Sequence, residues 1–478
     1  MSTPEDVVEA VLAGPKGADI GAFFDLDGTI VAGYTATAFW NDRVRNREVG
    51  LGEMATTIVA AIDGALLGGD PTKMGDVSVE SLRGHSEDEL VEFGERLFVQ
   101  KTAATIRTQS RDLIRAHLRM GHTVVVASAA TRFQIGPIAH DLGITNILCT
   151  EVEVEDGIFT GQLAGPMLWG EPKARAVRKF ARDNGIDLPA SYAYANGDED
   201  IAFLSSVGQP HALNPQRGLR EAATQQKWTI LEMREPKRAG LRALASTTAA
   251  MAGAGTGLGV GAALGILHGD KRFGVNTGLS LAADTALAVS GVRLNVIGEP
   301  NLWNARPAIF IANHQSSLDV LVVGSLLRRD YTMVGKKEAR YDPRALLGGL
   351  LIDPVYIDRS NPETAIDALS QLRDRVQSGT SIVVFPEGTR AATPELGPFK
   401  KGAFHMAMQA GVPIVPIVLR NTGELMWRRS KLVNPGVVDV CVLDPIPTDG
   451  WTPEDITDVT EQVRQQFVDT LEEWPEEA

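Results

Sequence analysis

Short apolar runs that end in polar residues occur in both the first and the last third of the chain. The run around Phe23 stops at Asp25, and a later run, 307–312, stops before Asn313 and His314. Apolar runs of this length favour buried strands. Polar residues directly after such strands lie at the edge of a parallel sheet where ligands bind. The pattern therefore predicts an α/β fold in both halves of the chain.

The middle of the chain has a different pattern, because the 25 residues from Ala243 to Leu267 carry no charge. At the helical rise this length is sufficient to cross a hydrocarbon layer of about 30 Å. Glycine recurs there at every fourth position, at Gly253, Gly257, Gly261 and Gly265. Small residues on one helical face permit close approach of a second helix. The expected partner is the next apolar stretch, Phe273 to Val292.

Basic residues flank both ends of the first apolar stretch; they are Arg234, Lys237, Arg238 and Arg242 on one side and Lys271 and Arg272 on the other. Cations at both ends favour the same anionic surface. A single crossing would place the two halves of the chain on opposite sides of the membrane. We therefore expect a helical hairpin that lies in or dips into one leaflet. A flexible Gly/Ala linker, or a small-residue helix pair buried in protein, is the alternative.

Length and charge limit the classes of protein that fit. With 478 residues the chain is long enough for two or three domains, and a formal net charge of −14 argues against a nucleic-acid binder. Ten acids in residues 449–478 against the single base Arg464 indicate a solvated acidic helix and tail. Cys149 and Cys441 are far apart, which indicates a reducing compartment. Residues 1–17 lack the pattern of a secretory signal.

The first motif that carries chemistry is Asp25-Leu26-Asp27-Gly28-Thr29. Asp25 is suited to attack a phosphorus atom, Asp27 to protonate the leaving oxygen, and Gly28 permits a tight turn. These residues resemble the first motif of the haloacid-dehalogenase superfamily, whose phosphatases form an aspartyl-phosphate with Mg²⁺ bridging nucleophile and phosphate. Taken alone, the motif also fits a calcium-like loop or an ordinary turn.

Further motifs of that superfamily follow in order over about the first 230 residues. The resemblance implies that Ser128, after the apolar run 124–127, holds a phosphoryl oxygen. It also implies that Lys173, at the start of a predicted helix 173–184, neutralises the developing charge. The spacing resembles the phosphoserine-phosphatase-like branch, which inserts a helical cap after the first motif. Residues 34–115 would supply that cap here.

The metal site implied by the resemblance is built from carboxylates. Asp25 and Asp27 would supply two ligands, and Asp198 is the best candidate for the third. Asp200 is the alternative, since Asn196 stands where many relatives carry an acid and the acidic cluster is compressed. The resemblance thus predicts a Mg²⁺ site whose third ligand is either Asp198 or Asp200.

His314 and Asp319 follow the predicted strand 307–312 with a spacing of five residues. On a regular helix this spacing separates two side chains by about 140°, so they cannot pair if the whole segment is helical. If the helix starts after His314, with Ser316 or Ser317 as N-cap, Asp319 reaches back to the imidazole. The carboxylate then orients Nδ1–H and leaves Nε2 free as a base.

Four blocks within residues 290–450 resemble the glycerolipid acyltransferase family, which transfers a fatty acyl group from acyl-CoA or an acyl carrier protein to a glycerophosphate hydroxyl. The blocks are His314-x4-Asp319, Val355-Tyr356-Ile357-Asp358-Arg359, Phe385-Pro386-Glu387-Gly388-Thr389-Arg390 and Val412-Pro413-Ile414-Val415-Pro416. Within the family, the pattern is most similar to the 1-acyl-glycerol-3-phosphate acyltransferases, which produce phosphatidic acid.

The resemblance assigns roles in a direct transfer without an acyl-enzyme. His314 would deprotonate the acceptor hydroxyl, Arg390 would bind the acceptor phosphate, and Glu387 would fix the glycerol hydroxyl or a basic neighbour. The turn at Gly388 would direct N–H groups toward the oxyanion. The candidate catalytic residues are His314, Asp319, Glu387 and Lys337, and the candidate substrate-binding residues are Lys336, Arg359, Gly388, Thr389 and Arg390.

We therefore predict a phosphatase domain at 1–232, a membrane-associating hairpin at 233–292, an acyltransferase domain at 293–450 and an acidic helix or tail at 451–478. The expected reaction is acylation of lysophosphatidic acid by acyl-CoA at the cytoplasmic face of the cell membrane. A Mg²⁺-dependent phosphatase of unidentified substrate accompanies it, and a homodimer is left open. Two alternatives are a membrane-tethered phosphatase whose C-terminal half only binds acidic lipids, and an acyltransferase with a non-catalytic N-terminal scaffold.

Overall fold

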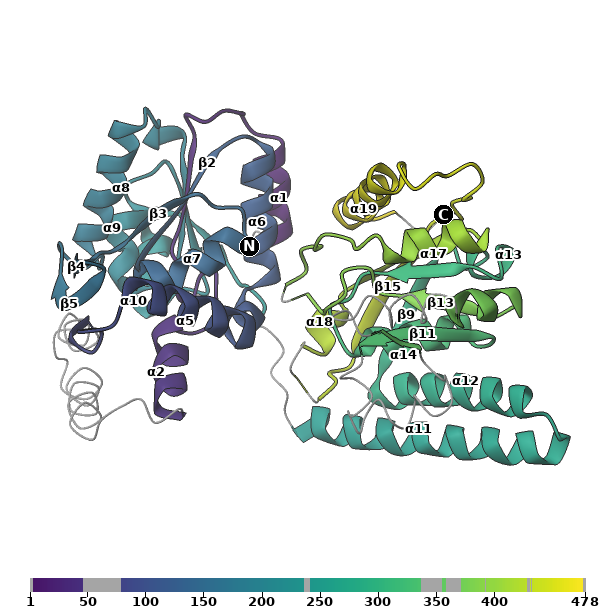
Figure 1. The fold of residues 1–478 in the computed structure, drawn as a ribbon. Helices are drawn as coiled ribbons and strands as arrows, with labels where there is room; N and C mark the ends of the chain where they lie inside the picture. The colour runs from purple at the N-terminus through teal and green to yellow at the C-terminus, as the bar shows by residue number, and fades with distance from the viewer. Residues whose placement is uncertain are drawn as a thin grey trace. The chain divides into compact units, whose positions relative to one another are not determined.

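The computed structural model describes residues 3–45, 79–235, 241–336, 355–357, 371–391, 393–427, 430 and 432–475 (Figure 1). The chain divides into two compact units, Met1–Pro236 and Lys237–Ala478. Each unit contains its own sheet, so each is described by itself.

The first unit is built on a parallel six-stranded sheet in the order β3-β2-β1-β6-β7-β8. Its strands are β1 (Gly21–Phe24), β2 (Thr123–Thr131), β3 (Asn146–Thr150), β6 (Tyr192–Ala195), β7 (Gln209–Leu213) and β8 (Thr229–Leu231). All four residues of β1 are buried, as expected for a central parallel strand. The predicted strand before Asp25 is confirmed as β1. The predicted strand 124–127 is confirmed as part of β2, which continues past Ser128 to Thr131.

Helices cover both faces of this sheet, with α8 and α9 on one side and α1 and α6 on the other (Figure 1). The helices of the unit are α1 (Pro4–Leu12), α2 (Thr35–Arg45), α5 (Glu87–Gln100), α6 (Thr108–Arg119), α7 (Arg132–Asp141), α8 (Glu171–Asp183), α9 (Ile201–Leu204) and α10 (Arg217–Gln226), with short 3-10 turns η1 (Thr102–Thr105), η2 (Leu188–Ala190) and η3 (Asp198–Asp200). This is the doubly wound α/β fold that the sequence predicted.

The segment between β1 and β2 is helical where the structure describes it. It contains α2, α5 and η1, which fit the predicted helical cap, and α6, which packs against α1 and β2 although the predicted cap extended to residue 115. Residues 46–78 lie outside the described residues. A separate antiparallel ribbon, β4 (Val152–Glu155) and β5 (Ile158–Leu163), follows β3. Phe159 of β5 is buried with Leu90 and Phe133, so the ribbon packs against α5 and α7.

The predicted helical hairpin begins the second unit. Helix α11 (Leu241–His268) packs along α12 (Lys271–Ser290), and glycines line the contact (Figure 1). A Cβ at Gly261 would lie 2.2 Å from Cα of Gly278, and one at Gly257 would lie 2.5 Å from the main-chain nitrogen of Ala282. Any larger side chain would therefore push the helices apart. The glycine spacing predicted both the partner helix and the face.

The two helices of the hairpin differ in their surroundings. Leu279 and Leu287 of α12 are buried in the core of the second unit. Helix α11 instead keeps large apolar side chains exposed, including Met251, Ile266 and Leu267. Among the described residues, Ala243–His268 is the one helix long and apolar enough, by length and composition, to cross a membrane.

The second sheet has seven strands in the order β12-β11-β13-β10-β14-β15-β9. They are β9 (Val292–Ile297), β10 (Ile309–Ala312), β11 (Tyr331–Lys336), β12 (Val355–Ile357), β13 (Ser381–Val384), β14 (Ile414–Arg420) and β15 (Gly436–Val442). Neighbours are parallel except β14 and β15, which are antiparallel. Strand β10 lies at the centre, which places the residues that follow it in the middle of the sheet edge.

Two hydrophobic cores lie on the two faces of this sheet, one with α12 and α14, the other with α17 and α19. The helices are α13 (Asn301–Asn304), α14 (Leu318–Leu327), α17 (Gly402–Ala410), α18 (Thr422–Leu425) and α19 (Ile456–Glu472). The acidic C-terminal segment is more than a solvated tail: α19 buries Ile456, Val463 and Phe467. Its acidic face is exposed because its apolar stripe is used for packing.

Candidate active sites

The first site is a buried cluster of charges at the carboxyl end of β1. Lys173 of α8 donates from Nζ to Asp25 Oδ1 and to Asp200 Oδ1, each at 2.7 Å. The main-chain N–H of Asp25 donates to Tyr194 O of β6 at 2.9 Å. All three charged side chains are almost completely buried. Residues from three distant parts of the chain therefore meet beside the candidate nucleophile.

Burial and charge act in opposite directions within this cluster. Burial, with a smaller contribution from Asp200, raises the pKa of Asp25 to about 7 against the opposing pull of Lys173. Burial alone would lower the pKa of Lys173, but the carboxylates of Asp200 and Asp25 hold it above its ordinary value. The lysine is therefore a permanent cation, and it partly offsets the cost of burying two carboxylates.

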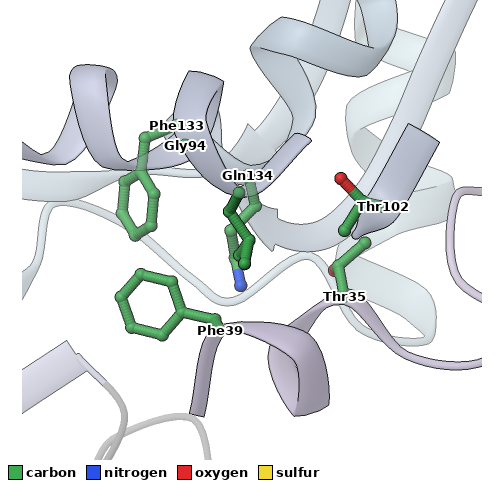
Figure 2. Close-up of a pocket in the computed structure, with 7 residues that line it drawn as sticks. Thr35, Phe39, Gly94, Thr102, Phe133 and Gln134 are labelled. Carbon is green, nitrogen blue, oxygen red and sulfur yellow. The ribbon is translucent and has the colours of Figure 1, made fainter. Parts of the chain in front are cut away.

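Asp27 is held by the first residue of α2, Thr35, which is shown in Figure 2. Its Oδ1 accepts from Thr35 N at 2.8 Å, and its Oδ2 accepts from Thr35 Oγ1 at 3.2 Å. Burial raises the pKa of Asp27 from its ordinary value. A carboxyl group with a raised pKa is suited to carry a proton to a leaving oxygen. Thr35 has no role in the sequence prediction, where no motif distinguished it from other cap residues.

Asp198 and Asp200 have different positions. The exposed Asp198 accepts from Leu219 N at 2.7 Å and so caps α10, and a Cβ at Gly218 would lie 2.9 Å from its Cγ. Asp200, by contrast, is 1% exposed and contacts Lys173. The structure therefore groups Asp200, the alternative ligand, with Asp25. Ser128 is buried within β2, three residues before the end of the strand, and its Oγ accepts from Ala130 N at 3.2 Å.

Carboxylate oxygens are the ligands that Mg²⁺ prefers, so the donor chemistry at this sheet edge suits that ion. The positions of these carboxylates fit a metal ion less well than their chemistry does. Among the described residues, no three His, Cys, Asp or Glu side chains are grouped so that they could hold a metal ion. Lys173 Nζ lies between Asp25 and Asp200, and Asp198 is turned to α10. As the side chains stand, the described residues do not form a three-carboxylate magnesium site.

The second site follows β10 in the other unit. Helix α14 begins at Leu318 with Ser317 as N-cap residue, so His314 lies before the helix and Asp319 in its first turn. Asp319 Oδ2 lies 2.7 Å from His314 Nδ1 and also accepts from Gln315 N and Ser316 N, both at 2.8 Å. Asp319 is fully buried. The predicted turn thus brings the two side chains together.

Three residues position His314: Phe385 and Asp319 contact its ring, and Glu387 contacts its main chain. Phe385 stacks on the ring at 4.1 Å between centroids, and Glu387 Oε1 accepts from the His314 main-chain N–H at 2.7 Å. With Nδ1 on Asp319, the ring presents Nε2, which forms no hydrogen bond within the described part of the chain. The side chain is 17% exposed. A positioned, partly accessible Nε2 is the arrangement that a general base requires.

Both carboxylate oxygens of Glu387 are bonded to main-chain groups. Oε1 accepts from His314 N, and Oε2 accepts from Gly397 N at 3.1 Å. Burial, with a smaller contribution from Asp319, raises the pKa of Glu387 to about 7. Glu387 therefore connects the loop of His314 to the loop of Gly397. No contact of Glu387 with a basic side chain occurs among the described residues.

The structure describes some of the other predicted residues of this site and not the rest. Arg390 Nη1 donates to Ser317 Oγ at 2.5 Å, so its guanidinium lies at the start of α14 beside the His314–Asp319 pair. Gly388 has φ 73°, which favours glycine, and it closes the turn that begins at Phe385, to whose oxygen its N–H donates at 3.0 Å. Lys337 and Arg359 lie outside the described residues, as does the side chain of Lys336 at the end of β11.

Asn313 is a residue whose part in the site the sequence did not reveal. Its Nδ2 donates to Leu419 O at 2.8 Å, and its Oδ1 accepts from Leu419 N at 2.7 Å. This side chain continues the hydrogen bonding to β14 after β10 has ended, which frees the backbone of His314 to turn. Phe385 also had no predicted role. The sequence offered one indication for each: Asn313 directly precedes His314, and Phe385 lies two residues before Glu387.

Comparisons with known families match both units. Residues 22–205 match the family of haloacid dehalogenase-like hydrolases, and residues 293–420 match the acyltransferase family. The chain is 41% identical over 186 residues to the 1-acyl-sn-glycerol-3-phosphate acyltransferase of Saccharomyces cerevisiae, which covers 38% of this chain and 61% of that protein. It is 34% identical over 184 residues to the alpha form of Homo sapiens, with 38% and 65% covered.

An uncharacterized acyltransferase of Schizosaccharomyces pombe is 39% identical over 193 residues, with 39% of this chain and 68% of that protein covered. The chain thus spans about three fifths of the length of the yeast 1-acyl-sn-glycerol-3-phosphate acyltransferase. Among solved structures, PlsC of Thermotoga maritima is similar at a TM-score of 0.43 and 22% identity, with 50% of this chain and 99% of that chain covered. A phosphoserine phosphatase gives 0.34 and 20%, with 46% and 95% covered.

Proposed function

The chain belongs to the acyltransferase family through its C-terminal half, to which a haloacid dehalogenase-like hydrolase domain is fused at the N-terminal side, and from this premise we propose that it acylates lysophosphatidic acid to phosphatidic acid. The acyl donor would be acyl-CoA or an acyl carrier protein. The relatives named 1-acyl-sn-glycerol-3-phosphate acyltransferases support this substrate. The observation that carries the proposal is the 2.7 Å contact between His314 Nδ1 and Asp319 Oδ2.

In the proposed reaction His314 Nε2 removes the proton of the acceptor hydroxyl, and the oxygen attacks the carbonyl carbon of the thioester. The C–S bond then breaks, and the sulfur leaves with the proton that His314 carries. Asp319 stabilises the imidazolium that forms between these two steps. The turn at Gly388 and Thr389 is the proposed oxyanion site; the Gly388 N–H donates to Phe385 O at 3.0 Å and would exchange this bond for one to the oxyanion.

The remaining cations of the motif blocks are assigned to the substrate phosphate. Arg390, at the start of α14, is the described member of this set. Lys336, Lys337 and Arg359 complete it as predictions from the sequence. A planar guanidinium can bind a phosphate with two parallel hydrogen bonds, so Arg390 would hold the acceptor while His314 acts on its hydroxyl. Glu387 would act by positioning His314, since its two oxygens bond main-chain N–H groups.

The direct test is His314→Ala in the full chain, with acylation of lysophosphatidic acid followed by mass spectrometry of the product. Loss of the base is expected to lower the turnover at least 100-fold, within the about 10²–10⁴-fold range of general-base catalysis. His405→Ala on α17 is the matched control and should retain activity. Retained turnover in His314→Ala would remove His314 as the base and favour the rival in which this half only binds acidic lipids.

For the first unit we propose hydrolysis of a phosphomonoester, supported by the Asp25–Lys173–Asp200 cluster. Asp25 would attack phosphorus while Asp27 gives its proton to the leaving alcohol, and Lys173 would neutralise charge on the phosphoryl group. Ser128 would hold a phosphoryl oxygen. Water would then hydrolyse the aspartyl-phosphate, with Asp27 taking its proton. The family generally uses Mg²⁺, which when bound would offset phosphate charge; no step here is assigned to it.

This second activity is tested with a generic phosphomonoester in the presence of Mg²⁺ or of a chelator. Wild type should hydrolyse the ester only with Mg²⁺, and Asp25→Asn should be inactive. Asp200→Asn should lose most activity, whereas Asp198→Asn should lose little beyond the loss of a helix cap. Equal rates for wild type and Asp25→Asn would instead mean that this unit is a non-catalytic scaffold beside the acyltransferase.

We also propose that the α11–α12 hairpin attaches the second unit to one membrane leaflet, at the cytoplasmic face. The exposed apolar side chains of α11 support this proposal; Ile266 is 82% and Leu267 is 79% exposed. Replacing both by Glu should abolish sedimentation with anionic phospholipid vesicles. Ile158→Glu, at an exposed apolar residue of the first unit, is the control. Undiminished sedimentation of the double variant would rule out this attachment surface.

A further inference from the structure

The loop between β14 and β15 contacts both the helical hairpin and the turn that carries His314. This β14–β15 loop runs from Asn421 to Pro435, and its described residues are 421–427, 430 and 432–435. A hydrogen bond from Asn434 N to Leu425 O at 2.8 Å closes the loop on itself. Val433 and Met426 are the chain neighbours of these two residues, so the bond holds Val433 and Met426 close together.

The Val433 end of the loop is bonded to α11. Thr247 Oγ1 accepts from Val433 N at 2.9 Å and donates to Ala243 O, one helical turn earlier, at 2.7 Å. Ala243 and Ala250 on the same side of the helix are buried. Val433 is buried as well, and a buried main-chain N–H needs an acceptor. In the described part of the chain, the hydroxyl of Thr247 is that acceptor.

The Met426 end of the loop is bonded to the active-site turn. Ser316 Oγ donates to Met426 O at 2.6 Å and accepts from Leu318 N at 3.1 Å. The main-chain N–H of Ser316 donates to Asp319 Oδ2 at 2.8 Å, and the same oxygen lies 2.7 Å from His314 Nδ1. Ser316 is completely buried. Its side chain therefore connects the start of α14, and the carboxylate that orients the base, to the β14–β15 loop.

These contacts form one continuous path from the hairpin to the catalytic pair. The path runs through Thr247, Val433, Asn434, Leu425, Met426, Ser316, Asp319 and His314. All of these residues belong to the second unit and to the described part of the chain. Contiguous networks of packed and hydrogen-bonded groups carry energetic coupling between distant sites. A displacement of α11 would thus reach the active-site turn through hydrogen bonds.

A lipid surface is the partner that α11 fits. Its side chains Met251, Ile266 and Leu267 are exposed, while its glycine face packs on α12. A leaflet takes up apolar side chains that point outward from the protein, and in this arrangement Thr247 faces Val433. A ligand that binds one arrangement better shifts the population toward it. Lipid binding should therefore favour the state in which the path is intact.

We propose that the β14–β15 loop couples the hairpin to the acyltransferase site, so that attachment of α11 to a phospholipid leaflet positions Ser316 and, through it, Asp319 and His314 for acyl transfer. Thr247 and Ser316 are positioning residues, because both act through other residues. The inference rests on the proposed acyltransferase function and hairpin attachment, and it deepens them by assigning a regulation to the site.

The first experiment separates the lipid that activates from the lipid that reacts. The full chain acylates hexanoyl lysophosphatidic acid, which stays in solution, with or without vesicles of phosphatidylcholine and phosphatidylglycerol. Vesicles should raise kcat of wild type about tenfold, within the usual range of coupling between two sites. Thr247→Val removes the acceptor of Val433 N and should reduce this activation to about twofold or less, while the variant still sediments with the vesicles.

Thr248→Val is the matched control. The Thr248 hydroxyl donates to Leu244 O at 2.9 Å, as Thr247 does to Ala243 O, but within the described residues it has no bond to the loop. Thr248→Val should keep the full activation, and Thr247→Ser, which retains a hydroxyl, should restore it. Activation of Thr247→Val equal to that of wild type, an equal loss in Thr248→Val, or a wild type without activation each overturns the inference.

The second experiment separates this inference from the acyltransferase proposal. Hydrogen exchange of residues 315–319 is measured without substrates, with and without the same vesicles. In wild type and Thr248→Val, vesicles should slow exchange of the amides that donate to Asp319 and Ser316. In Thr247→Val they should not. This pattern supports the coupling even if no acylation is detected. Acylation together with an equal effect of vesicles on all three proteins would instead retain the acyltransferase and reject the coupling.

Discussion

The two candidate sites are both built at the carboxyl end of a central parallel strand, but they assemble from different distances along the chain. His314 and Asp319 are 5 residues apart, and one helix start brings them together. Lys173 is 148 residues from Asp25 and 27 from Asp200, and only the sheet and α8 bring these three together. The spacing along the sequence was therefore sufficient to predict the His314–Asp319 pair. It was insufficient to predict the cluster of Asp25, Lys173 and Asp200.

The sites also differ in how they hold a buried carboxyl group. Burial raises the pKa of both Asp25 and Glu387 to about 7. Asp25 has an ionic partner in Lys173, whereas Glu387 is bonded to the main-chain N–H groups of His314 and Gly397. A full charge offsets the cost of burial in one unit, and dipoles do so in the other. Variants that remove either kind of support should therefore have different consequences.

The largest effect is expected for Lys173→Met. This change leaves two buried carboxylates without their cation, which should lower the free energy of unfolding of the first unit by about 3–5 kcal/mol. Lys179→Met, on the same helix and in a 3.1 Å ion pair with Asp183 that is mostly exposed, should cost less than about 1 kcal/mol. Urea unfolding of both variants gives the comparison. Equal losses would mean that the cluster is not held by its charge.

A smaller effect is expected from the titration of Glu387. Its folded-state pKa of about 7 lies above its ordinary value of 4.5, so the native state binds more protons between these values. The free energy of unfolding should therefore decrease by about 2–3 kcal/mol as the pH rises from about 4.5 to 7. Glu387→Gln should remove this slope.

Hydrogen exchange of β10 at pH 5, 6 and 7 measures the effect in the second unit alone. Glu299→Gln, at an exposed position of the same unit, should keep the slope of the wild type. If Glu387→Gln and wild type lose protection in parallel as the pH rises, then main-chain N–H groups keep Glu387 ionised and the proposed contrast with Asp25 fails.

The smallest effect concerns a contact that the sequence did locate, between the two helices of the hairpin. Gly261→Ala places a Cβ 2.2 Å from Cα of Gly278 and should destabilise the second unit by about 1–3 kcal/mol. Gly259→Ala meets nothing within 4 Å and should be neutral or stabilising by up to about 1 kcal/mol, since alanine favours the helix. Thermal unfolding gives the sign of each change. A stabilising Gly261→Ala would show that the helices do not pack through this face.

The elements that the sequence predicted are those with local signals. The strands before Asp25 and His314 and the strand that carries Ser128 followed from short apolar runs, and the hairpin from glycine at every fourth position. The third carboxylate of the first site had no such signal. Asp198 and Asp200 are two residues apart, and only the packing of α8 and α10 shows that one contacts Lys173 and the other caps a helix.

The sequence by itself determined two α/β units of parallel sheet, the glycine face between α11 and α12, and the His314–Asp319 pair, because each depends on periodicity or on spacings shorter than about two helical turns. The tertiary structure decided which acid joins Asp25 and Lys173, that Thr35 holds Asp27, and that Asn313 and Phe385 position His314. These contacts join residues distant along the chain, and side chains that meet through packing leave no periodic pattern in the sequence.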